Sequence, residues 1–167
     1  MLIQDGIPTR EDIQSVTPPA HRLAQGAVAI AECFQKIPCN PCAKACVKKA
    51  IRVEPDINAT PKVDFDICNG CAACVARCPG LAIFVVDMTY SGGEALVKLP
   101  FEFLPVPQEG QLACGLSRSG EELGWFPVVK AVSGGKRNMT CTISLAVPKE
   151  LAMEVRNIKV GGYRDGR

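Results

Sequence analysis

Histidine is almost missing from this chain, since His21 is the only one among 167 residues. A single imidazole excludes zinc sites and catalytic centres that need two or more of them. Aromatic residues make up only 5% of the sequence. Apolar runs such as Leu81–Val86 fall far short of the roughly 20 residues that a membrane-spanning helix needs. We therefore expect no transmembrane segment.

An excess of charge of one sign is also missing. Lysine and arginine number nine against nine acidic residues through Tyr90, and ten against eight after it, which gives the net charge of +2. Nucleic-acid binding is disfavoured, because it needs a basic stripe that this chain lacks. The part after Tyr90 contains no glycine-rich phosphate loop and no nucleophile elbow. We expect a chain without an active site of its own.

Cysteine, in contrast, is abundant, with ten residues. Four of them form the run Cys68-x2-Cys71-x2-Cys74-x3-Cys78, which is followed by Pro79. This spacing is typical of the ligands of a 4Fe-4S cluster. Structural zinc sites more often use two close cysteine pairs, or cysteine mixed with histidine. The run therefore predicts an iron–sulfur site.

A second group of cysteines lies upstream, at Cys33, Cys39, Cys42 and Cys46. A shift of 32 residues places the last three of them on Cys71, Cys74 and Cys78, so the chain contains an internal duplication. The duplication predicts a cysteine at position 36, where Lys36 stands instead. We interpret the upstream group as a run with a lengthened loop, whose first ligand is Cys33.

The fourth cysteine of each run in two-cluster ferredoxins binds the cluster of the other run. If this chain follows that rule, cluster one takes Cys46, Cys68, Cys71 and Cys74, and cluster two takes Cys33, Cys39, Cys42 and Cys78. Full ligation leaves no open iron position, so the expected chemistry is one-electron transfer. Two such cubes would bring the net charge to about −2, which favours a subunit held in a complex over a freely diffusing carrier.

Three alternatives stay open for the cysteines. A disulfide framework would suit a short secreted chain, but Met1–Asp5 does not begin a signal peptide. A zinc site could use the same thiolates. Cys33 could be a buried apolar thiol, which would leave the second cluster with three ligands. We expect Cys114 and Cys141, outside both runs, to be core residues.

The fold class that we expect is α+β, with a bacterial two-cluster ferredoxin-like domain followed by a small β-barrel domain and a short C-terminal helix. The expected divisions are an N-terminal arm at 1–27, the ferredoxin domain at 28–90, a docking barrel at 91–160 and a mobile tail at 161–167. The strands expected before residue 91 are 28–32, 51–53, 62–65 and 83–86, with helical segments at 43–50 and 75–78. After residue 90 we expect strands at 95–99, 111–116, 125–132 and 140–147, and a helix that begins at Pro148.

Three segments together resemble one known family. They are Ile37–Cys42, the dicluster segment that ends at Ile83, and Val147–Ile158. Together they are similar to the small ferredoxin-type subunit of heteromeric FAD-dependent dehydrogenases of the proline, hydroxyproline and opine type. The resemblance spans most of the chain. Two positions depart from the family pattern, because Val47 stands where proline is usual and the spacing after Cys33 is long.

The resemblance implies an electron-transfer subunit with two 4Fe-4S clusters. A partner flavoprotein subunit, which holds FAD, would oxidise a secondary amine or amino acid, and a 2Fe-2S subunit is a further candidate partner. The ligands carried over are Cys39, Cys42, Cys46, Cys68, Cys71, Cys74 and Cys78, with Cys33 as the eighth. We expect a cytoplasmic hetero-oligomer. The alternatives are a free soluble ferredoxin and a zinc-stabilised adaptor.

Overall fold

The computed structural model describes residues 6–135 and 139–166. Its chain begins with two short helices, α2 at Arg10–Val16 and α3 at Ala20–Leu23. Thr9 caps α2 through a reciprocal pair of hydrogen bonds with Asp12, which satisfies two backbone N–H groups at the helix start. The expected arm therefore contains two short helices, and residues 1–5 lie outside the described part.

The cysteine-rich half is built on two antiparallel strands, β1 at Val28–Ala31 and β4 at Ile83–Asp87. Strands were expected at 28–32 and 83–86, and both are present with nearly these bounds. The other elements of this half are the helix α4 at Pro41–Ala45, the strands β2 at Ile51–Arg52 and β3 at Lys62–Val63, and the 3-10 turn η1 at Val75–Arg77.

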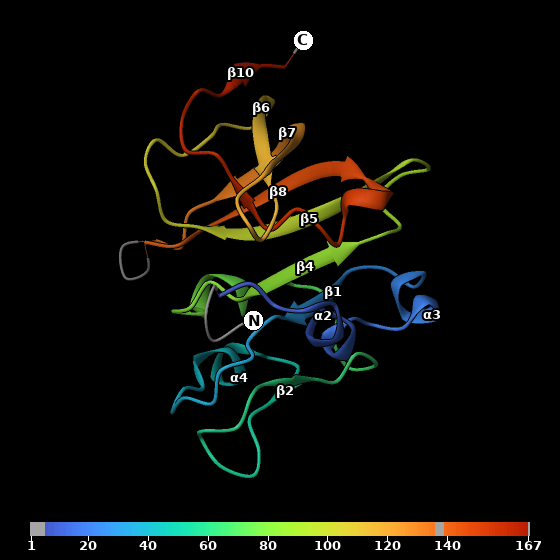
Figure 1. Ribbon diagram of the computed structural model, residues 1–167, viewed down its shortest axis with the longest axis vertical. Coiled ribbons are helices and arrows are strands. Elements are labelled where there is room, and N and C mark those ends of the chain that lie inside the picture. Colours follow the sequence, from blue (N-terminus) through green and yellow to red (C-terminus); the bar gives the residue numbers. More distant parts are fainter. Residues whose placement is uncertain (1–5, 136–138, 167) are drawn as a thin grey trace.

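The second half contributes the longer strands. They are β5 at Glu94–Phe101, β6 at Gln111–Leu116, β7 at Glu122–Val132 and β8 at Cys141–Pro148, with the short strands β9 at Asn157–Ile158 and β10 at Arg164–Asp165. Figure 1 shows β4, β5 and β8 across the middle of the molecule, with β6 and β7 above them and α4 and β2 below.

The large sheet is open, so the expected small β-barrel is wrong. Its eight strands follow the order β1-β4-β5-β8-β7-β6-β10, with β9 beside β6, and its neighbouring strands are antiparallel. To close a barrel, the second half alone would need β5 to pair with a strand at the opposite edge of its sheet, where β6 and β10 lie. Strand β5 pairs instead with β4 on one side and β8 on the other. The boundary expected after residue 90 falls in the hairpin between β4 and β5.

Strands β1 and β4 separate two hydrophobic cores, because alternate side chains of a strand point to opposite faces. Ile30, Phe84 and Val86 face the larger core, which the second half encloses. Ala29 and Val85, among others, face a smaller core that also contains Cys42, Cys74 and Cys78. Both faces of β1 are buried, which explains its continuous apolar sequence.

The C-terminal part differs from the expected helix and tail. Pro148 ends β8 opposite Glu94, and only one 3-10 turn follows, η2 at Lys149–Leu151. Proline is tolerated at the end of a strand, where its missing N–H breaks no ladder bond. The tail expected to be mobile contributes β10, which pairs with β6. Among residues 6–135 and 139–166, every helix is too short or too polar to cross a bilayer.

Candidate metal centre

Four thiols from two distant parts of the chain lie around one hollow beneath β1. Its lining contains Cys68, Cys71 and Cys74 of the downstream run together with Cys46 of the upstream run. The hollow encloses about 300 Å³ of space free of protein atoms, part of it open to solvent. Cys74 is 6% exposed, and Cys71 is at the surface. This is the set of cysteines expected to bind cluster one.

A second hollow, of about 360 Å³ by the same measure, has the complementary set of thiols. Cys33, Cys39 and Cys42 of the upstream run line it together with Cys78 of the downstream run. Cys33 therefore lies where the missing cysteine at position 36 would have been needed. The structure brings together each of the two sets that the duplication predicts, and their binding to iron stays a prediction.

Burial and mutual repulsion make three of these thiols, Cys33, Cys42 and Cys74, hard to ionise without a metal. The pKa of Cys74 is raised to about 12, first by burial and then by the nearby thiols of its own set, Cys68, Cys71 and Cys46. The pKa of Cys42 is raised to about 11, again first by burial, and then by Cys78, Cys39 and Cys33. Burial is also the largest reason that the pKa of Cys33 is raised. Binding of a cluster must therefore displace protons from these thiols.

The two cysteine runs end in equivalent loops, and in each loop a backbone N–H group donates a hydrogen bond to the sulfur of the last cysteine of the run. Lys49 and Leu81, 32 residues apart, both have left-handed backbones, with φ of 55° and 52°. Each turn directs the following N–H at a thiol, so Ala50 donates to Cys46 Sγ at 3.2 Å and Ala82 donates to Cys78 Sγ at 3.4 Å. N–H groups that donate to ligand sulfurs stabilise the more negative, reduced state of a cluster.

Cys68 receives a third bond of this kind, from the N–H of Ala29 at 3.3 Å. This contact joins the downstream run to β1. Lys48 lines the same hollow, and Lys49 and Val47 are exposed nearby. The side chain of Val47, at the position where the family pattern has proline, is 84% exposed.

The donor set fits an iron–sulfur cube. Within residues 6–135 and 139–166, no three histidine, cysteine, aspartate or glutamate side chains gather as ligands of one metal ion. A cube differs from a single ion, because each of its irons takes its own thiolate and the four sulfurs are spread around the cluster. Four cysteines around a hollow have this arrangement. All ten cysteines are free thiols, and Cys114 and Cys141 are buried in the second half, as expected.

Arg22 of α3 is a site residue that the sequence interpretation missed. It is 6% exposed, and its guanidinium donates to the carbonyl oxygens of Phe65 and Cys68, both at 2.6 Å. It also donates to the carbonyls of Gly26 and Ala27. Arg22 therefore ties α3 to the loop that carries Cys68. Its partners are main-chain atoms up to 46 residues away, so no local sequence signal could have identified it.

Gly70 brings the same loop against the start of β1. Its φ is +65°, and a Cβ built at this position would lie 2.3 Å from the Cβ of Ala27. The ammonium of Lys98 on β5 donates to the carbonyl of Gly70 at 3.3 Å. The loop between Cys68 and Cys71 is therefore packed on one side by β1 and fastened from the second half of the chain.

Comparisons with known proteins identify a 4Fe-4S binding segment in the chain. Residues 61–84 match the family described as the 4Fe-4S binding domain, Fer4. Over 57 residues the chain is 44% identical to the ferredoxin-type protein NapF of Haemophilus influenzae. The matched segment is 33% of this chain and 32% of that protein. The chain is 36% identical over 52 residues to the ferredoxin-type protein NapF of Escherichia coli K12, covering 30% of this chain and 32% of that protein.

The chain thus spans about a third of the length of the curated relatives that it matches. No solved structure gives a significant match. The matched segment, 61–84, contains the complete downstream cysteine run, and its thiols are the ones gathered beside β1. Residues 61–84 are therefore a ferredoxin-type 4Fe-4S binding segment. A 4Fe-4S cluster held by four cysteines supports one-electron transfer.

Proposed function

We propose that this chain carries two 4Fe-4S clusters and passes single electrons between a flavoprotein dehydrogenase and a further acceptor in the cytoplasm. The observation that carries the proposal is the exchange of Cys46 and Cys78 between the two hollows. Three thiols of one run and one of the other surround each hollow, which is the ligand pattern of two-cluster ferredoxins. A bound 4Fe-4S cluster supplies reversible one-electron exchange.

The residues around the hollows would hold the clusters and influence their potentials. Cys46 and Cys78 each fasten one run to the other, and the N–H groups of Ala50 and Ala82 donate to their sulfurs. Cys71 is exposed, whereas Cys42 and Cys74 are each 6% exposed. The Cys71 side of the downstream hollow is therefore a short route between the protein interior and a docked partner.

The proposed partner is the FAD-containing subunit of a dehydrogenase that oxidises a secondary amine or amino acid, with a 2Fe-2S subunit as a further candidate. Its support is the resemblance carried by Ile37–Cys42 and Val147–Ile158. The main alternative is a free ferredoxin, which would act without a lasting partner. The dehydrogenase subunit and the free ferredoxin would use the same clusters, and they differ only in whether the chain forms a lasting complex.

The experiment is anaerobic co-expression of this chain with an FAD-containing amino-acid dehydrogenase subunit from the same organism, followed by purification through a tag on this chain. We expect a stable complex in which proline, hydroxyproline or an opine reduces the flavin and then the clusters, followed by absorbance and electron paramagnetic resonance. The Cys71→Ser variant, with an exposed ligand removed, is the matched control and should slow cluster reduction without changing flavin reduction. Purification of this chain alone, with clusters that the reduced flavoprotein does not reduce, would reject the dehydrogenase partner.

A further inference from the structure

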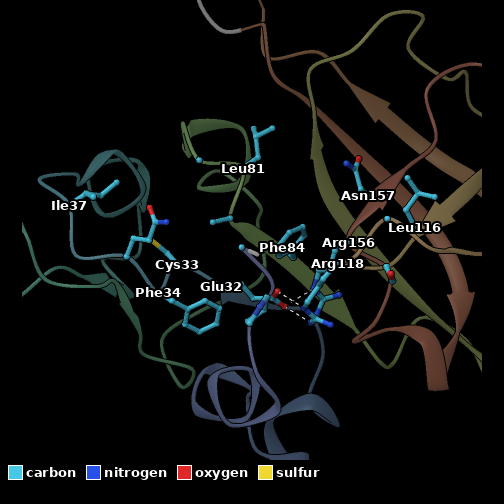
Figure 2. A pocket seen from close by; sticks show the side chains of 17 residues that line it. Glu32, Cys33, Phe34, Ile37, Leu81, Phe84, Leu116, Arg118, Arg156 and Asn157 are labelled. Atoms are coloured by element: carbon cyan, nitrogen blue, oxygen red, sulfur yellow. Dashed lines mark hydrogen bonds and ion pairs between the residues drawn. The ribbon is translucent and has the colours of Figure 1, made fainter. Parts of the chain in front are cut away.

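Glu32 directly precedes Cys33, and its carboxylate is held by two arginines from the other half of the chain (Figure 2). Arg118 approaches it with two nitrogens, Nε donating to Oε2 at 2.8 Å and Nη2 donating to Oε1 at 2.7 Å. Arg156 Nε donates to the same Oε1 at 2.6 Å. The side chain of Glu32 is 6% exposed and that of Arg156 is 3% exposed. The three residues form a buried ionic cluster.

Both arginines are themselves fixed by the second half. Arg156 donates to the carbonyls of Ala152 and Val155, and its guanidinium lies over the ring of Phe84 at 4.9 Å from the centroid. Arg118, in the turn between β6 and β7, donates to the carbonyl of Met153 at 2.7 Å. Because the guanidinium groups are held by main-chain acceptors, they form a rigid receptor for the Glu32 carboxylate.

Glu32 is also the last residue that the sheet holds before the lengthened loop. Its N–H donates to the carbonyl of Ala82 at 2.8 Å, next to the end of β1. Residues 33–40 then contain no helix or strand, until α4 begins at Pro41. Cys33 therefore follows a residue that is held by the sheet, and it begins an irregular loop. Successive side chains of an extended segment point in opposite directions, so anchoring Glu32 on one side directs Cys33 toward the other.

Glu32, Arg118 and Arg156 lie together at the junction of the two halves, in a cavity that Cys33 also borders (Figure 2). Cys33 lies between this cavity and the upstream hollow, because it also lines the hollow of Cys39, Cys42 and Cys78.

We propose that Glu32, held by Arg118 and Arg156, is the positioning residue for Cys33, so that the second half of the chain determines whether the upstream cluster has its fourth ligand. This inference rests on the proposed two-cluster function. It explains how a ligand displaced by three residues from its expected place can still reach the hollow. The downstream run has a different anchor, since Arg22 and the N–H of Ala29 hold Cys68.

The test is anaerobic purification of Glu32→Gln, Arg118→Lys and Arg156→Met, with Lys159→Met as the matched control. Lys159 pairs with Glu122 on the exposed surface of the same half, so its loss removes an ion pair without touching Glu32. Iodoacetamide labels thiols that are not bound to iron, and peptide mapping then identifies each labelled cysteine. Iron content and the paramagnetic spectrum of the reduced protein give independent readouts.

We expect Cys33 labelling to rise at least several-fold in all three variants of the ionic cluster, while Cys68 and Cys71 stay protected. Iron content should fall from about eight toward about four per chain, with the signal of the downstream cluster retained. Arg118→Lys, which keeps the charge but loses the paired contact, should show the smallest change and remains informative if Arg156→Met does not fold. Lys159→Met should match the wild type.

Two outcomes would overturn the inference. One is unchanged protection of Cys33 and unchanged iron in variants whose melting temperature has fallen, which would make the ionic cluster purely structural. The other is equal labelling of Cys33 and Cys68, which would indicate a general loss of folding. A wild-type chain that already has Cys33 labelled, or only one cluster, would instead reject the proposed function on which the inference rests.

Discussion

Cys46 and Cys78 occupy exchanged positions, each in the hollow formed by the other cysteine run. Their surroundings repeat after 32 residues, with a left-handed residue three positions later and an N–H donor one position after that. The exchange ties the two halves of the duplication to each other. Loss of either cysteine should therefore affect the hollow of the distant run.

Replacement of Cys46 tests this exchange. Cys46→Ala should perturb the cluster held by Cys68, Cys71 and Cys74, since it removes the fourth thiol of that set. Spectra of the reduced protein, with iron content, should show loss or conversion of the downstream cluster and a preserved upstream one. The control is Cys114→Ala, a buried cysteine outside both hollows, which should keep its iron. Loss of the upstream cluster in Cys46→Ala would contradict the exchanged arrangement.

Gly70→Ala should destabilise the downstream loop. The left-handed backbone costs a residue with a Cβ about 1–2 kcal/mol, and this Cβ would also overlap the Cβ of Ala27 at 2.3 Å. We expect faster loss of iron to a chelator and a lower melting temperature. Gly80→Ala is the matched control, because a Cβ there meets nothing within 4 Å. Equal behaviour of the two variants would show that the contact with Ala27 does not constrain the loop.

Arg22→Met should weaken the attachment of the Cys68 loop to α3. Four carbonyl oxygens accept hydrogen bonds from this guanidinium, and each buried acceptor left unpaired costs about 1–3 kcal/mol. The rate of iron loss to a chelator should rise by about tenfold or more, since 1.4 kcal/mol corresponds to tenfold. Arg22→Lys keeps the charge and should recover part of the difference. A wild-type rate in Arg22→Met would remove this residue from the site.

A fragment of residues 1–90 should not retain both clusters. Phe84 and Val86 would lose their cover from the second half, and each large apolar side chain exposed costs about 1.5–3 kcal/mol. The fragment would also lose Arg118 and Arg156, the partners of Glu32. Iron analysis and hydrogen exchange of the β4 amides measure the effect. The control is deletion of 161–167, which removes β10 but leaves β4 covered, so this variant should keep its iron. A fragment 1–90 with full iron would show that the halves fold independently.

Local patterns predicted much of the first half. The apolar sequences at 28–32 and 83–86 predicted strands close to the observed β1 and β4. The 32-residue repeat, together with the ligand rule of two-cluster ferredoxins, predicted which thiols gather. Cys141, expected to be a core residue, lies on a buried face of β8, although Ser144 and Ala146 on the opposite face are buried as well. These features depend on neighbours along the chain or on a repeat, so they can be seen in the sequence itself.

Features that depend on distant partners were missed. The sheet stays open because β5 pairs with β4, a choice that strand patterns alone do not reveal. Glu32 and Arg156 are 124 residues apart, and the sequence around either residue gives no signal of their contact. The helix α2 is a different case, because Thr9 and Asp12 form a capping box that was available as a sequence signal. Pro148 was assigned to a helix start, although it also suits the end of a strand.

The most direct measurement is the iron and acid-labile sulfide content of the anaerobically purified full chain, with a reductive titration followed by electron paramagnetic resonance. Two cubes predict about eight iron and about eight sulfide per chain. The spectrum of the fully reduced protein should show two magnetically interacting clusters, since the two thiol sets share one small core. About four iron per chain, or stoichiometric zinc in a colourless protein, would contradict the two-cluster electron carrier.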